Sequence, residues 1–203
     1  MSTAPARRPA GTPARPPFGF TLRAPAGWQA LRGDTPSLAD DLLALVARTP
    51  LWEQLDDRRR GGLGVVLHGI ARAGAATGGC ATLLHLPAPD ATPADEHPEV
   101  SSISLTWLRT APLRADLDLA RAVLSEGEPV ATGLGPGLVT TRADSAASEG
   151  HVLQLAAPVP GSIWLAVLTG TTTAAAYLPA LEEAVLAVAT SLGVHRPARA
   201  GER

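Results

Sequence analysis

The last third of this 203-residue chain constrains its fold most, because strand, turn and helix patterns follow one another there in a clear order. Residues 138–142, 151–155 and 163–168 are rich in Leu, Val, Ile and Thr, as expected of strands, and a Pro-Gly turn separates the last two. Residues 174–192 then carry apolar side chains at helical spacing. This order predicts the closing hairpin and covering helix of a small sandwich of sheet and helices.

The earlier part of the chain adds strands and helices of the same kind. Ile103, Leu105 and Trp107 alternate with Ser and Thr, so this strand should bury one face, which is typical of an antiparallel sheet. Residues 18–22 and a return strand from Trp28 read as a hairpin. The other patterns predict helices over about 37–48, 51–76 and 115–125 and strands over 80–86 and 129–132. We expect an α+β fold in which an antiparallel β-sheet of about six or seven strands is flanked by helices.

Length and composition favour one domain with tails. A chain of this size suits a single core, and 45% of its residues are apolar. Residues 1–17 are rich in Ala, Pro and Arg, which predicts a disordered arm. We therefore expect a single domain over 18–193 and a disordered tail over 194–203.

The charge balance gives no indication of nucleic-acid binding. All 17 basic residues are Arg, yet the net charge is −2 and no basic stripe stands out. The chain also has no run of about 18 apolar residues, so we expect no direct insertion into a membrane. Residues 1–17 lack the apolar centre of a signal peptide, which favours a cytoplasmic location.

Residues with reactive side chains form no recognisable catalytic or metal-binding pattern. Cys80 is the only cysteine, so the chain can form neither an internal disulfide nor a site of several cysteines. The five histidines do not have metal-ligand spacing, and no Gly-x-Ser-x-Gly elbow is present. Ser148, Glu149 and His151 are close neighbours in sequence, which rarely point to one centre. We therefore predict no catalytic residue, no cofactor and no metal, and a protein that is not an enzyme.

Two short segments are the candidate contact points for a partner. Leu51 and Trp52 are apolar residues next to a predicted helix boundary. Gly133, Gly135 and Gly137 suggest a turn or bulge at a strand edge. A Gly-rich ligand loop is the other interpretation of this segment, but the spacing differs from that of a dinucleotide-binding loop.

Three features of the chain form a recognisable series: the opening Phe18-x-Phe-x-Leu-x-x-Pro-x-Gly-Trp28, the segment Gly135-Pro-Gly-Leu-Val-Thr-Thr-Arg142, and the closing hairpin and helix. This order of elements resembles that of Mog1/PsbP-like proteins, including the LpqN-type lipoprotein branch and uncharacterised actinobacterial members. The absence of Lys and Asn also resembles proteins from GC-rich actinobacteria. The resemblance implies a sheet flanked by helices and a binding or assembly role, sometimes associated with secretion. It supplies no catalytic residues, and this chain lacks the lipobox cysteine of the lipoprotein branch.

These observations lead to one leading hypothesis and two others. The leading one is a non-catalytic protein-binding adaptor or assembly module that contacts a protein partner or another copy of itself. The alternative is a small-molecule binder or weak hydrolase, with a pocket between the sheet and the helix that carries His68, lined by His85 and Trp107. A structural subunit of a larger assembly is the third possibility, and it is compatible with the first.

Overall fold

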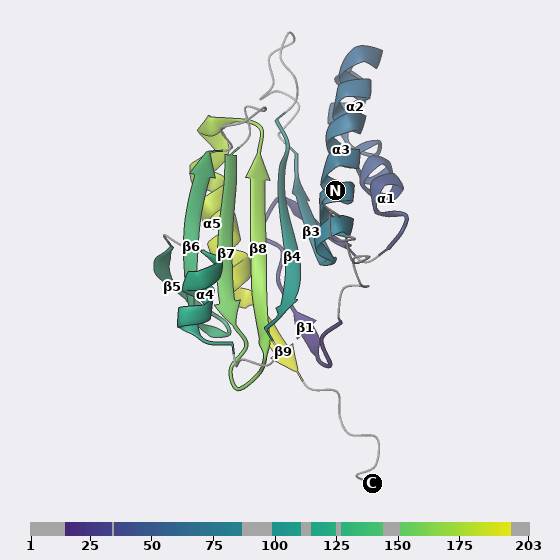
Figure 1. Ribbon diagram of the computed structural model, residues 1–203. Coiled ribbons are helices and arrows are strands. Elements are labelled where there is room, and N and C mark those ends of the chain that lie inside the picture. Colours follow the sequence, from purple (N-terminus) through teal and green to yellow (C-terminus); the bar gives the residue numbers. More distant parts are fainter. Residues whose placement is uncertain are drawn as a thin grey trace, which may run out of the picture.

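The computed structural model of the chain contains one sheet of seven strands with helices on both faces (Figure 1). The structure describes residues 15–33, 35–86, 99–110, 115–124, 127–143 and 151–195. In spatial order the strands are β2 (Trp28–Arg32), β3 (Gly79–His85), β4 (Ser101–Arg109), β8 (Trp164–Thr172), β7 (His151–Pro158), β6 (Gly135–Ala143) and β5 (Glu128–Thr132). All neighbouring pairs are antiparallel, which confirms the expected α+β class.

The first strand does not pair as the sequence suggested. β1 (Gly19–Thr21) forms a separate two-stranded ribbon with β9 (Gly193–His195), near the C-terminal end of the described chain, so the predicted hairpin with Trp28 is wrong. The ring centroids of Phe18 and Trp107 are 5.0 Å apart, in an edge-to-face contact. Phe20 packs against the same indole at 5.7 Å. Contacts with a distant strand therefore determine the pairing of β1, although the local sequence favours a turn toward Trp28.

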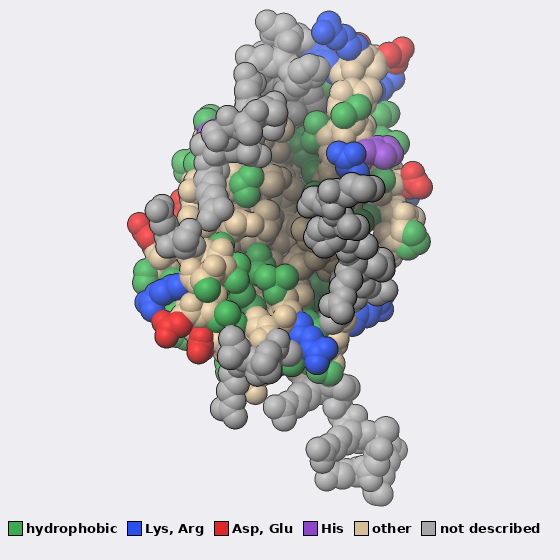
Figure 2. Space-filling model, viewed as in Figure 1, with side chains coloured by type: hydrophobic (Ala, Val, Ile, Leu, Met, Phe, Trp, Pro, Cys, Tyr) green, Lys and Arg blue, Asp and Glu red, His purple; other side chains and the backbone are tan. Residues whose placement is uncertain are grey.

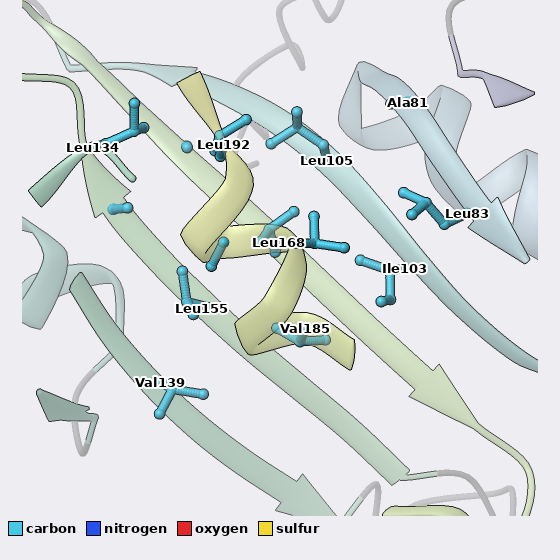
Figure 3. Close-up of a cluster of buried hydrophobic side chains, with 14 of the residues drawn as sticks. Ala81, Leu83, Ile103, Leu105, Leu134, Val139, Leu155, Leu168, Val185 and Leu192 are labelled. Atoms are coloured by element: carbon cyan, nitrogen blue, oxygen red, sulfur yellow. The ribbon is translucent and has the colours of Figure 1, made fainter. Parts of the chain in front are cut away.

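One face of the sheet is covered by α5 (Leu178–Ser191), which follows a short 3-10 turn, η2 (Ala175–Tyr177). Leu181 and Val185 of this helix contact the sheet at Gly170, where an added Cβ would lie within 3.1 Å of both side chains. Figure 3 shows Val185 facing Leu168 and Leu155 on the strands below it. The largest buried apolar cluster among the described residues lies here, so α5 and this face form the main core.

The opposite face is covered in two separate places. At one end lie α1 (Leu38–Val46), α2 (Pro50–Gln54) and α3 (Asp57–Thr77), which bury Leu84 of the sheet. At the other end α4 (Leu117–Val123) covers Leu138, Ala156 and Leu165. Figure 1 shows α3 and α4 on different sides of this face, with strands between them.

The helix expected over 51–76 is divided into α2 and α3. Leu55 has an extended backbone with ψ of 134°, and the next residue, Asp56, caps α3 by accepting a hydrogen bond from the Arg59 backbone N–H at 2.8 Å. Such a cap satisfies one of the free N–H groups of the first turn. The glycines at 61, 62 and 64 lie inside α3 and do not break it.

The turn between β5 and β6 docks against the end of α5. The Gly133 N–H donates to the Ala189 carbonyl at 2.9 Å, and a Cβ at Gly133 would lie 2.7 Å from the Thr190 carbonyl oxygen and still closer to that of Leu192. The missing side chain therefore allows two backbone segments to meet.

We expect Gly133→Ala and Gly64→Ala to change stability in opposite directions. Gly133→Ala should lower the free energy of unfolding by about 1–3 kcal/mol, because its methyl group has no space. Gly64→Ala should raise it by about 1 kcal/mol, because a Cβ there meets nothing within 4 Å and alanine favours the helix. Urea denaturation of both variants measures this. Equal effects of the same sign would contradict the described docking.

Candidate binding surfaces on both sides of helix α3

Leu51 and Trp52, the apolar partner-binding candidates, have roles inside the chain. Leu51 is only 3% exposed and belongs to the cluster under α1, α2 and α3. Trp52 is half-buried, and the Arg60 guanidinium lies 5.4 Å from its ring centroid. This cation–π contact, together with the hydrogen bond from Arg60 Nε to the Trp52 carbonyl at 3.2 Å, joins α2 to α3. Their contact with a partner stays a prediction.

The three glycine candidates shape the turn at the sheet edge. Gly135 has a φ of +114°, which side chains rarely tolerate, and a Cβ on Gly137 would lie 2.9 Å from the Ala156 carbonyl oxygen. Gly133 is explained by its close backbone contacts with the end of α5. Backbone geometry therefore explains all three glycines. The neighbouring edge strand contains Pro129, which lacks an N–H and so discourages the addition of a further strand.

A cavity of about 280 Å³ does lie between α3 and the sheet. His85 and Trp107, which were expected to line it, are not among its lining residues. His85 lies near the rings of Trp28 and Tyr177, with centroids at 5.4 and 6.2 Å, and Trp107 belongs to the core under α5. His68 is exposed, and its Nδ1 lies 2.9 Å from the Gly64 carbonyl oxygen.

Uncharged residues line this cavity, which we call the polar slot. The sheet contributes five hydroxyl side chains, and α3 contributes small or apolar residues and one further threonine. The lining residues are Ser102, Ser104 and Thr106 of β4, Thr169 and Thr171 of β8, and Gly69, Ile70, Ala73, Gly74 and Thr77 of α3. Figure 2 views this side of the molecule, where a hollow runs between the strands and the helices.

The slot belongs to a polar row that crosses the sheet. Consecutive partners in the strand register are Thr140, Gln154, Thr169, Ser104 and Thr82, so all five lie on the same face. The first four are half-buried and Thr82 is fully buried. The alternation of β4 had indicated a polar face at Ser102, Ser104 and Thr106. It could not show that α3 covers part of that face.

Four of the six hydroxyl groups that line the slot bond to one another in two pairs. Ser102 Oγ and Thr171 Oγ1 lie 2.8 Å apart, and Thr106 donates to Thr77 at 3.5 Å. Thr82 Oγ1 is buried and has no hydrogen-bond partner among the described residues. It lies 4.0 Å from where a Cβ on Gly74 would be, but it is not among the residues that line the slot. A buried hydroxyl without a partner destabilises a fold by about 1–3 kcal/mol.

The other side of α3 forms a second surface, which we call the outer face. Gly61, Gly64, Val65, His68, Gly69 and Arg72 line a shallow furrow along it. Val65 is 75% exposed, the largest exposure of a large apolar side chain in the described part of the chain. Added Cβ atoms at Gly61, Gly64 and Gly69 would meet nothing within 4 Å. No sequence motif identified this face, because its residues share only their exposure in the folded structure.

Few described residues offer reactive chemistry. No group of three or more His, Cys, Asp or Glu side chains among them is placed to hold a metal ion. The Cys80 thiol is half-buried and donates to the Leu105 carbonyl at 3.2 Å. Within the same ranges, no helix is both long and apolar enough to cross a membrane.

The chain matches no family model and no curated protein. The resemblance to Mog1/PsbP-like proteins therefore stays a prediction. The two surfaces of α3 are the candidate binding sites in the described part of the chain.

Thr82→Val should stabilise the chain. Valine has nearly the shape of threonine and removes the hydroxyl that lacks a partner, so the free energy of unfolding should rise by about 1 kcal/mol. Thr106→Val is the matched control, because that hydroxyl already has a partner and its loss should give no gain. Urea denaturation distinguishes the two variants. A less stable Thr82→Val protein would show that the hydroxyl is satisfied.

His85 should make stability depend on pH. Burial lowers the pKa of its imidazole, so the folded chain binds its proton less readily than the unfolded chain does. The contribution of neutral His85 to the free energy of unfolding is complete above the unfolded pKa of about 6.5 and declines as the pH falls below it. In thermal unfolding between neutral and mildly acidic pH, His85→Gln should lose less stability than the natural chain. Equal losses would contradict this assignment.

Proposed function

We propose that this protein is a non-catalytic adaptor or assembly module that binds a protein partner through the outer face of α3. The observation that carries the proposal is that the glycines on that face lower the stability of helix α3. Each glycine inside a helix is less favourable than alanine by about 1 kcal/mol, so Gly61, Gly64 and Gly69 together cost about 3 kcal/mol. No contact within the described chain requires a missing side chain at these positions.

A docked partner would account for the glycines at these positions. Two helices usually pack with their axes about 8–10 Å apart, and the distance depends on the side chains at the contact. A furrow of glycines lets a partner approach α3 closely, and Val65 supplies an apolar side chain at its centre. His68 and Arg72 continue the face with polar groups, as expected at the rim of an interface.

Val65→Asp should reduce partner capture at least about tenfold, because it places a charge at the centre of the contact. Valine and aspartate have similar helix propensities and Val65 is exposed, so the fold should be kept. Val123→Asp on α4 is the matched control, since Val123 is an exposed apolar residue on another helix. Affinity capture from the native cells with quantitative mass spectrometry measures the effect. Equal recovery of every protein with both variants would contradict docking at this face.

A further inference from the structure

The polar slot has the dimensions of a single extended chain. The segment of α3 that lines it, Gly69 to Thr77, is about 12 Å long at 1.5 Å per residue. The facing segment of β4, Ser102 to Thr106, is about 13 Å long. A cavity of about 280 Å³ spread over this length is narrow. At about 3.3–3.6 Å per residue, it holds three or four residues of an extended peptide.

The chemistry of the lining selects an uncharged occupant. None of the lining residues carries a charge, so an ionised ligand would lose its hydration without gaining an opposite charge. Hydroxyl groups both donate and accept hydrogen bonds. Peptide groups alternate donors and acceptors along an extended chain, and therefore match a wall of hydroxyls. The small residues of α3, Gly69, Ala73 and Gly74, keep this wall of the slot open, and the cavity volume of about 280 Å³ limits the occupant to small side chains.

One further observation connects the slot with binding. Gly69 lines both the slot and the furrow of the outer face. The two surfaces thus meet at one residue on α3.

We infer that the polar slot binds an extended, uncharged peptide segment of three or four small residues, presented by a protein that docks on the outer face of α3. This inference rests on the proposed adaptor function and adds the chemistry of what the partner presents. It assigns Ser104 and Thr169 to contact with the peptide backbone and Gly69 to the mouth of the slot.

The test uses a blocked tripeptide as the probe. N-acetyl-Ala-Gly-Ala-amide has no charge, and the same tripeptide with free termini is its charged counterpart. Titration of the full chain, followed by ¹H–¹⁵N NMR, should show saturable shifts around the slot with the blocked peptide. Binding of the free tripeptide should be at least about tenfold weaker. Absence of saturable shifts, or equal binding of both peptides, would overturn the inference.

Two pairs of variants locate the probe. Gly69→Leu should block the mouth and weaken binding at least about tenfold, whereas Ala76→Leu, on an exposed part of the same helix outside the slot, should bind as the natural chain does. Thr169→Val should weaken binding and Thr140→Val, in the same polar row but outside the slot, should not. Unchanged binding by Gly69→Leu would overturn the inference. Because the probe needs no docked partner, failure here ends the slot proposal alone, and capture with Val65→Asp decides the adaptor function separately.

Discussion

The unequal covering of the two faces of the sheet is the constraint on which the rest of the structure depends. One face is sealed by α5, and its strands carry Leu, Ile, Val and Trp there. The other face is covered by α3 at one end and α4 at the other, so the positions between them are only partly shielded from solvent. Apolar side chains at those positions would remain in contact with water. Thr140, Gln154, Thr169 and Ser104 occupy them instead, and the polar slot is the part of this row that α3 overhangs.

Helix α3 consequently has two different sides. Its inner side is fixed by packing, with Leu63, Leu67 and Ala71 buried against α1 and the sheet. Its outer side carries glycines that weaken the helix and Val65 that stays in solvent. Packing explains the first arrangement but not the second. The proposed docking explains why a long covering helix keeps residues that lower its own stability.

Local patterns were sufficient to predict most of the fold. The alternation of β4, the Pro-Gly turn and the apolar stripe of α5 are short-range signals, and the structure contains each of them. The pairing of β1 with β9 could not be predicted, because it depends on Phe18 and Phe20 meeting Trp107 from far along the chain. The break at Leu55 has a local cause in the Asp56 cap, which the apolar stripe concealed.

The candidate site was harder to predict than the fold, for a physical reason. Leu51, Trp52 and the three glycines were selected by residue type, and in the structure packing and backbone geometry explain them. The polar slot is formed where α3 meets β4 and β8, segments up to about a hundred residues apart, and the outer face is defined only by exposure. Neither the cavity nor the exposure can be predicted from the residues of a single segment.

The most direct test of the proposed docking is site-specific photo-crosslinking in the native cells, with a photoreactive residue in place of Arg72 or, as a reference, Val123. Arg72 is an exposed residue at the rim of the outer face, where a larger side chain leaves the glycines of the furrow uncovered, and Val123 is an exposed residue on α4. Docking on the outer face predicts one dominant protein crosslinked to position 72 and none to position 123. No crosslinked protein at position 72, or the same proteins at both positions, would contradict it.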